Sequence, residues 1–427
     1  MRFGVFFELQ MPRPWAEDTE AKLYHEALET IELADRLGIQ HAWAQEHHFL
    51  EEYSHSTAPE VFLAAASQRT KRIRLGHGVT LLPPPINHPA RIAERVSALD
   101  IVSNGRVEWG TGESSSRIEL EGFNVDYMEK RAMWAEAIRE CAKMMAATPY
   151  PGFEGKYFSM PARNIIPKPV QKPHPPCWVA CTNRDTMKLA ARLGLGALTF
   201  AFMDAKEAKF WVEEYYETFK RECTPIVQNV NPNIAMLTGI YCHPDGARAR
   251  ELGEEGQRFF AYGLAHYYRF GAHVPGRTSI WEEFKKAPPF PMAGHAGLGS
   301  PEEVRENFEA LEQAGVDQLI LLQQAATYKH EGICESLELF GNSVLPAFIE
   351  REAARQAKKQ AELAPYIEAA LARVDRVEHG EIPVVESYPK LWERNKAVAL
   401  DALTPNRQVG SEAVWRMSVG GINRQKK

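Results

Sequence analysis

Eight short apolar segments recur along the chain, and longer amphipathic segments separate them. The short segments are rich in β-branched and aromatic residues, which predicts strands. They cover residues 2–7, 41–46, 73–82, 106–112, 177–181, 197–202, 233–241 and 318–324. The amphipathic segments predict helices over 22–38, 59–69, 89–101, 126–147, 184–193, 204–222, 245–269 and 301–314. Apolar strands that alternate with helices indicate a parallel sheet covered on both faces. Eight such units predict a (β/α)8 TIM barrel, with an open doubly wound sheet as the alternative.

Three segments exceed what a minimal barrel needs. Residues 148–175 are rich in proline and glycine and predict a small hairpin insertion. Residues 270–299 form a long irregular connection, and a loop of that length is usually functional, so we expect a lid. The third segment is the C-terminal region. We therefore predict a barrel domain over 1–350 and a C-terminal helical extension and tail over 351–427.

Charge and hydropathy exclude several classes of partner. The 427 residues carry a formal net charge of −6, whereas nucleic acids and anionic lipids demand clustered positive charge. The first apolar run is too short for a signal peptide, and no window approaches a membrane span. The six cysteines include no CxxC pair. We expect a cytoplasmic protein with reduced thiols that binds neither nucleic acid nor membrane.

The second predicted strand ends in an acid and two histidines, Glu46, His47 and His48. A histidine at a strand end often makes only local hydrogen bonds. However, barrels keep their catalytic groups at the carboxyl ends of the strands, where an imidazole can move protons near neutral pH. We therefore predict that Glu46, His47 and His48 are catalytic.

Glycines inside two predicted strands need an explanation. Gly76 and Gly78 lie in the third strand, and "EWGTGESSSR" ends the fourth with Gly110, Thr111 and Gly112 followed by Glu113. Glycine weakens a strand and is retained where a flat ligand or another backbone comes close. No phosphate-loop pattern is present in either stretch.

The fifth strand runs into a helix within "CTNRDT", residues 181–186. Thr182 or Asn183 is the expected N-cap. Exposed backbone N–H groups, the hydroxyls of Thr182 and Thr186 and the cation of Arg184 would suit a phosphate monoester. Simple helix capping explains the same residues equally well.

Taken together, four stretches resemble the bacterial luciferase-like family of flavin-dependent monooxygenases. They are "EHHF" (46–49), residues 69–112, "ELEGF" (119–123) and residues 179–196, and the resemblance runs from residue 1 to about 350. It implies a barrel, usually dimeric, that binds FMN across the strand carboxyl ends. Reduced FMN would react with O₂ to give a C4a-peroxy adduct that attacks a small, largely apolar organic substrate. A separate NAD(P)H:flavin reductase would supply the reduced FMN.

The resemblance also assigns roles to individual residues. His47 matches the family's catalytic histidine, and Thr182 and Asn183 fall on its phosphate turn. Gly78 and Val79 fall where the family tends to carry a non-prolyl cis peptide against the flavin. Gly112 and Glu113 depart from the light-emitting members, which carry a reactive cysteine and a phosphate-binding arginine there, so we expect Arg184 to supply the cation.

The chemistry gives the remaining residues a role. A flavin peroxide needs a dry pocket and a positioned acid or base, and His47 with Glu46 nearby to tune it fits that need. We expect Trp43, Phe49, Tyr53 and Trp109 to line the pocket.

Three alternatives remain open. A barrel metallohydrolase could assemble Glu46, His47, His48, His55 and His77 around zinc, although the first strand lacks an HxH pair. A barrel that binds flavin without oxygen chemistry is the second. A deazaflavin F420-dependent oxidoreductase of the same family is the third.

Overall fold

The barrel strands form where the sequence alternates short apolar runs with helices. The computed structural model describes residues 1–200, 202–292, 295–374 and 382–385. Chain contacts divide it into two units, Met1–His379 and Gly380–Lys427, and the barrel lies in the first. Its strands are β1 (Arg2–Phe7), β2 (His41–Ala44), β3 (Arg74–Leu81), β4 (Val107–Gly112), β7 (Cys177–Cys181), β8 (Gly196–Thr199), β9 (Ile234–Cys242) and β11 (Gln318–Leu322).

These strands close into a barrel. Their order is β9-β11-β1-β2-β3-β4-β7-β8, and β8 pairs back with β9. Every pairing within this set is parallel. The structure therefore confirms the closed eight-stranded (β/α)8 barrel, and the open-sheet alternative is wrong.

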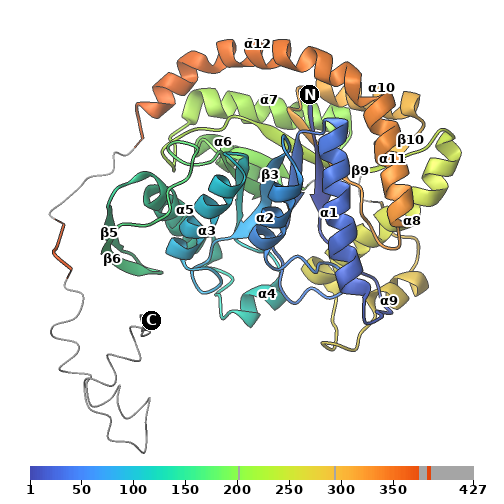
Figure 1. The fold of residues 1–427 in the computed structure, drawn as a ribbon, viewed down its shortest axis with the longest axis horizontal. Coiled ribbons are helices and arrows are strands. Elements are labelled where there is room, and N and C mark those ends of the chain that lie inside the picture. The colour runs from blue at the N-terminus through green and yellow to red at the C-terminus, as the bar shows by residue number, and fades with distance from the viewer. Residues whose placement is uncertain (201, 293–294, 375–381, 386–427) are drawn as a thin grey trace, which may run out of the picture. The chain divides into compact units, whose positions relative to one another are not determined.

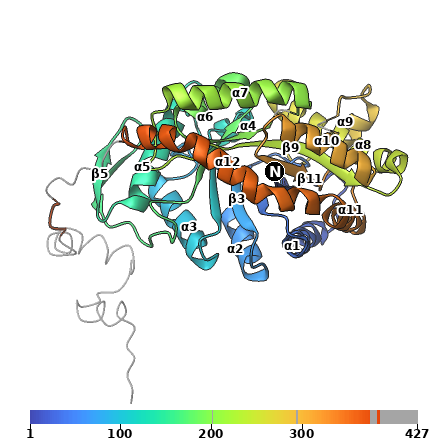
Figure 2. The ribbon, with the colours of Figure 1, turned by 90° about the horizontal axis from the view of Figure 1, so that it is seen from above.

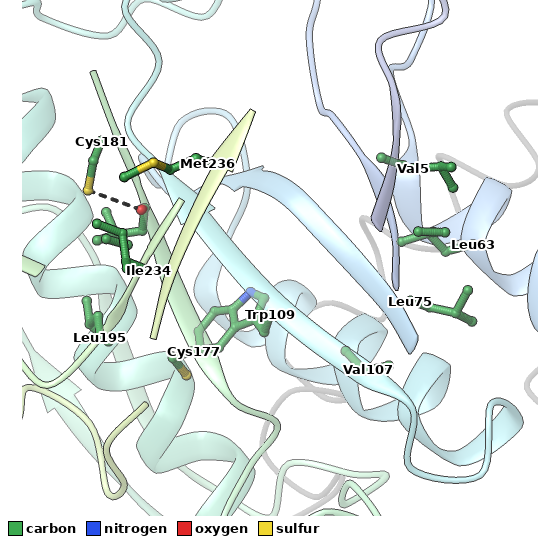
Figure 3. Close-up of a cluster of buried hydrophobic side chains, with 14 of the residues drawn as sticks. Val5, Leu63, Leu75, Val107, Trp109, Cys177, Cys181, Leu195, Ile234 and Met236 are labelled. Carbon is green, nitrogen blue, oxygen red and sulfur yellow. Dashed lines mark hydrogen bonds between the residues drawn. The ribbon is translucent and has the colours of Figure 1, made fainter. Parts of the chain in front are cut away.

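Strand alternation separates two apolar layers. On β1, Phe3, Val5 and Phe7 face outward and join the large cluster between the strands and the helices. Figure 3 shows part of this layer, including Val5, Leu75 and Trp109. Phe6 belongs instead to a second cluster with Trp43, inside the barrel. The inner row of β1 thus runs Gly4, Phe6 and then Glu8, beyond the carboxyl end of the strand.

The helices surround the barrel (Figure 1). They are α1 (Thr19–Leu37), α2 (Pro59–Arg69), α3 (Pro89–Val102), α4 (Arg117–Gly122), α5 (Lys130–Ala146), α6 (Arg184–Arg192), α7 (Ala205–Glu222), α8 (Gly246–Ala265), α10 (Pro301–Gln313) and α11 (His330–Ser343). Local signals set several ends. Gly38 closes α1 with φ +88°, and Ser300 with Glu303 forms a capping box at α10.

The helix predictions differ from the structure at two places. The helix predicted over 126–147 corresponds to α5, and the short α4 before it was not predicted. The helix predicted over 245–269 ends at Ala265 and continues as a π-helical turn, η1 (His266–Phe270). The change to η1 does not follow from hydrophobic periodicity, because the apolar pattern continues through it.

The two predicted excursions contain regular structure. Residues 148–175 include the antiparallel hairpin of β5 (Tyr150–Glu154) and β6 (Ser159–Arg163). Residues 270–299, expected to be irregular, hold the helix α9 (Ile280–Lys286) and the short strand β10 (Gly297–Gly299), which pairs with β9. Residues 293–294 lie outside the described part.

The helix α12 (Leu345–Leu371) crosses the amino end of the barrel, opposite α4 and α9 (Figures 1 and 2). It carries Lys359, whose Nζ lies 2.8 Å from Asp317 Oδ1 at the start of β11. The other end, where α4 and α9 lie, is the one at which the strands finish. Most of the predicted tail, residues 375–381 and 386–427, lies outside the described residues.

Candidate active site

Three side chains meet at the carboxyl end of the barrel although they are far apart in sequence. Glu8 directly follows β1, His47 follows β2, and Glu119 lies on α4 after β4. All three are buried, with 1%, 5% and 0% of their surfaces exposed. Parallel strands bring their carboxyl ends to one edge, so the topology places these residues together.

Glu119 holds the imidazole of His47. Its Oε1 lies 2.9 Å from His47 Nδ1 and also accepts the backbone N–H of His48 at 2.8 Å. The hydroxyl of Ser114 donates to the other oxygen at 2.6 Å. With both oxygens engaged, Glu119 fixes the ring orientation of His47 and favours a proton on Nδ1.

The other ring nitrogen faces Glu8. His47 Nε2 lies 3.3 Å from Glu8 Oε1. Neither carboxylate oxygen of Glu8 has a hydrogen-bond partner within the described part of the chain. His47 is therefore held between two buried acids, one with its bonds satisfied and one without.

Burial and charge act on the protonation of this group. Burial alone would lower the pKa of His47, but the charges of Glu119 and Glu8 outweigh it and raise that pKa to about 9. Burial raises the pKa of Glu8 to about 7, although the His47 charge opposes the shift. The pKa of Glu119 is lowered despite burial, because His47 and Ser114 stabilise its charged form. His47 is thus protonated at neutral pH.

Glu46 and His48 form a separate pair. His48 Nε2 lies 3.2 Å from Glu46 Oε1, and Glu46 also accepts the backbone N–H of Leu81 at 2.8 Å and the amide of Asn87 at 2.7 Å. Glu46 therefore ties the end of β2 to the end of β3. Glu46 was expected to tune His47. Its charge does help to raise the pKa of that ring, but Glu119 and Glu8 act more strongly and face its two nitrogens.

The strand glycines make room for protein atoms. A Cβ on Gly76 would lie 2.2 Å from the ring of Trp43, so this glycine admits a core side chain rather than a ligand. A Cβ on Gly110 would lie 2.0 Å from the carbonyl oxygen of His77, and one on Gly112 would lie 2.5 Å from Val79. The cis peptides among the described residues all precede proline, so the expected cis bond between Gly78 and Val79 is absent.

Thr111 and Glu113 have structural partners. The Thr111 hydroxyl donates to the carbonyl of Trp178 at 2.8 Å and accepts from the indole of Trp134 at 3.1 Å. It faces the helix layer, away from the barrel interior. Glu113 pairs with Lys130 at 2.8 Å and with Arg131 at 2.5 Å. Glu113 therefore gathers two cations beside the end of β4.

The turn after β7 is a capped helix start. Asn183 is the N-cap of α6 and forms a capping box with Thr186, while Thr182 is exposed. Arg184 turns to the surface, where its Nε lies 2.8 Å from Glu214. The expected phosphate cation is thus engaged elsewhere. Arg131, which pairs with Glu113, lies near enough to Cys181, the last residue of β7, for its charge to oppose the burial that raises the pKa of that thiol to about 12.

Comparison with known proteins identifies the family. The sequence profile described as luciferase-like monooxygenase matches residues 1–318. The chain belongs to this family. The flavin-dependent trigonelline monooxygenase oxygenase component of Acinetobacter baylyi is 27% identical over 83% of this chain and 98% of its own. Limonene 1,2-monooxygenase of Rhodococcus erythropolis is 26% identical over 81% of this chain and 86% of its own.

Solved structures of other proteins share the fold. Monooxygenase RslO1 from Streptomyces bottropensis is 26% identical, with a TM-score of 0.67 over 82% of this chain and 100% of its own. The oxygenating constituent of 3,6-diketocamphane monooxygenase from Pseudomonas putida, solved with FMN, has a TM-score of 0.63 at 20% identity, covering 81% and 98%. An F420-dependent secondary alcohol dehydrogenase has a TM-score of 0.61 at 18% identity, covering 80% and 98%. The last two show the fold alone.

Two further features bear on the alternatives drawn from the sequence, namely metal-binding geometry and membrane-spanning helices. In the described ranges, no group of three or more His, Cys, Asp or Glu side chains, the group of Glu8, His47 and Glu119 included, is arranged to hold a metal ion as the metallohydrolase alternative would require. Within those same ranges, no helix is long and apolar enough to span a membrane.

The aromatic residues expected to line the pocket separate in the structure. Tyr53 lies against His47, with ring centroids 5.8 Å apart. Trp43 fills the barrel interior, Trp109 faces the outer layer, and Phe49 is 52% exposed. Tyr268, from η1, packs on His47 with centroids 6.4 Å apart and was not expected.

Sequence reasoning missed Glu8, Glu119 and Arg131 of this luciferase-like site. Glu8 did carry a signal, because it continues the inner row of Gly4 and Phe6 with a charge where the apolar run ends. Glu119 lies in the quoted "ELEGF" stretch, but nothing in its spacing indicates contact with a histidine 72 residues away. Arg131 depends on how α5 packs against the barrel, which periodicity does not reveal.

Proposed function

We propose that this chain is the oxygenase component of a flavin-dependent monooxygenase that inserts one atom of O₂ into a small organic substrate. The observation that carries the proposal is His47, buried at the barrel mouth between Glu119 and Glu8 in a member of the luciferase-like family. Two relatives with monooxygenase names, which match more than four-fifths of the chain, support it.

His47 is suited to hold and deliver a proton. Glu119 orients its ring through Nδ1, so Nε2 is the atom that faces the reacting groups. Because the pKa of His47 is raised, the imidazolium can stabilise a negative charge beside it or donate its proton at neutral pH. Glu119 acts through His47 as a positioning residue.

The residues at the strand ends fit reduced FMN. Gly78, Val79, Gly110 and Gly112 lie together at the carboxyl ends of β3 and β4, where the flavin ring would bind. Thr182, Asn183 and Thr186 at the α6 N-terminus, with Arg131 near Cys181, would hold the phosphate. When bound, reduced FMN would supply the two electrons that activate O₂.

Aromatic residues would keep water from the reaction. Tyr53 packs on Phe260 with centroids 5.6 Å apart and on Tyr267 of η1 at 6.1 Å. The mouth is therefore covered from α8 and η1 by rings rather than by charged groups. A dry site prevents activated oxygen from escaping as H₂O₂.

The test is turnover with chemically reduced FMN, which removes the need for a reductase. Purified protein should quench FMN fluorescence, consume O₂ with reduced FMN and incorporate ¹⁸O from ¹⁸O₂ into a hydrophobic or heteroaromatic test compound. An NAD(P)H:flavin reductase should replace chemical reduction. Preferential binding of F420, with no ¹⁸O incorporation, would favour the oxidoreductase alternative instead.

We also propose a homodimer, formed through α2 and α3. These adjacent helices expose Val61, Ile101 and Val102, which are 67%, 40% and 46% accessible. Burying these side chains against a second copy would remove apolar surface from water. Val61→Asp should shift the sedimentation coefficient toward that of a monomer, and an unchanged value would contradict this interface.

A further inference from the structure

The carboxylate of Glu8 is a buried group without a partner. It is 1% exposed, and neither of its oxygens has a hydrogen-bond partner within 3.5 Å in the described ranges, while the hydroxyls of Tyr53 and Ser54 lie near enough to act on its charge. A buried carboxylate normally has hydrogen bonds or a counter-ion, because desolvation of the charge is costly. Its position on the inner row after Phe6 directs it to the end of the barrel where the substrate would lie. Such an acid is poised for a partner that the chain itself does not provide.

Charges at the barrel mouth do not balance. Within 4 Å, the sole charged partner of Glu8 among the described residues is His47, and that imidazolium is already paired with Glu119. One cation therefore serves two acids. Ionised Glu8 leaves this buried group with an excess negative charge, which a bound cation would neutralise.

The surrounding rings suit a cation as well. Tyr53 and Tyr268 both pack on His47, and both are close enough to Glu8 for its charge to raise the pKa of their hydroxyls. The faces of aromatic rings attract cations, and a carboxylate closing such a group of rings strengthens that attraction.

We propose that Glu8 is a specificity-determining residue that selects substrates with a positively charged nitrogen, such as a quaternary ammonium or an N-alkylated aromatic ring. The carboxylate neutralises the charge while Tyr53 and Tyr268 contact the apolar body of the substrate. This inference rests on the proposed function and narrows its substrate class.

The test compares two probes that match in shape and differ in charge, N-methylpyridinium and toluene. Their affinities for the FMN-loaded protein are measured by ligand NMR titration at a pH of about 8, where Glu8 is ionised. The wild-type protein should prefer N-methylpyridinium. Glu8→Gln should lower that affinity by about tenfold or more and leave toluene within about twofold. Glu121→Gln, which removes an exposed charge from α4, is the matched control and should change neither affinity.

The pH dependence gives a second measurement. Affinity for N-methylpyridinium should rise between about pH 6 and about pH 8 as Glu8 ionises, whereas toluene affinity should stay constant. The other titratable groups that face Glu8 are His47, Glu119, Tyr53 and Tyr268, and none of these is expected to ionise or discharge within that interval.

The outcomes separate the two proposals. Equal binding of both probes by wild type, or an unchanged preference in Glu8→Gln, overturns the role of Glu8 while FMN quenching still supports the flavin site. Absence of FMN quenching in wild type overturns the proposed function. If Glu8→Gln does not fold by circular dichroism, the wild-type pH series decides, and a flat cation affinity overturns the inference.

Discussion

Glu119 Oε1 bonds both the ring of His47 and the backbone N–H of His48, at 2.9 and 2.8 Å. One oxygen of a residue on α4 therefore fixes the backbone and the imidazole of a turn that follows β2. This shared acceptor explains how a loop can present an imidazole with a defined orientation. Removal of the charge at Glu119 should affect the ring more than the backbone.

Glu119→Gln should keep the fold, because an amide oxygen can still accept the His48 N–H. Without the negative charge, the pKa of His47 should fall, so the alkaline limb of the pH–rate profile should move to lower pH. We expect kcat to fall by about 10- to 100-fold with FMN affinity unchanged. Steady-state rates across pH check this, and an unshifted alkaline limb would contradict the positioning role.

His47→Gln should uncouple oxygen consumption from product formation. Glutamine retains polar contact with the two flanking acids, whereas alanine would leave them facing a cavity. Product formation should fall by about 10²- to 10⁴-fold. Oxygen uptake with reduced FMN should continue and appear as H₂O₂, measured with a peroxidase assay. His48→Gln, on the ring paired with Glu46, is the control and should remain better coupled.

Arg131→Leu should weaken FMN binding, and Arg184→Leu should not. The charge of Arg131 opposes the raised pKa of Cys181 at the end of β7, so this cation lies near the proposed phosphate site. Arg184 instead pairs with Glu214 at the surface. Loss of a phosphate cation should cost about tenfold in FMN affinity, and Thr182→Ala should cost roughly 1 to 2 kcal/mol through a lost hydrogen bond. Quenching of FMN fluorescence measures all three. Equal effects of the two arginine variants would place the phosphate elsewhere.

Much of the barrel could be predicted from sequence because its signals are local. Each strand of the barrel is a short apolar run, and the predicted bounds of 2–7, 177–181 and the helix at 59–69 match the structure. The differences between prediction and structure were confined to short segments. The short helix α4, which was not predicted, and the change to η1 at His266 depend on packing against the barrel mouth, which periodicity does not encode.

The site could be predicted only in part. The pair of histidines at the end of β2 indicated the correct edge of the barrel, because strand order alone brings those ends together. Their partners could not be assigned, since Glu8 and Glu119 reach His47 only through tertiary packing. The strand glycines indicated a close approach but not the group that approaches. Gly76 does admit a flat ring, but the ring belongs to Trp43.

Glu52→Gln should loosen the segment of residues 270–299 that the sequence predicts to be a lid. Buried Glu52 accepts the backbone N–H groups of Arg13, Ile280 and Trp281, and so ties the start of α9 to the loops after β1 and β2. An amide has one acceptor oxygen, so it would leave a buried N–H unpaired at a cost of about 1 to 3 kcal/mol. Limited proteolysis should cut residues 270–292 faster than in wild type.

Glu282→Gln is the matched control for the loss of these Glu52 hydrogen bonds, because Glu282 is an exposed residue of α9. It should leave the cleavage rate unchanged. Bound FMN and substrate should slow cleavage in both wild type and Glu282→Gln. Identical cleavage of Glu52→Gln and wild type would show that the segment is held by its apolar contacts alone.

The buried group of Glu8 and His47 should make the protein less stable as pH rises. Folding raises the pKa of His47 from 6.5 to about 9, so the stability it contributes is complete below about pH 6.5 and is lost as pH rises through about 9. Folding also raises the pKa of Glu8 from 4.5 to about 7, so its ionisation lowers stability as pH rises toward and through 7. Both residues therefore act in the same direction. The His47 shift corresponds to roughly 3 kcal/mol at most.

Urea unfolding of wild type between about pH 6 and about pH 9 should show a steeper decline in the free energy of unfolding than that of the double variant Glu8→Gln/His47→Gln, in which neither group titrates. Since every other titrating residue is common to the two proteins, the difference between their free energies of unfolding isolates this pair. Parallel declines would mean that neither pKa is raised by folding, and the protonated His47 on which the proposed chemistry depends would not exist at neutral pH.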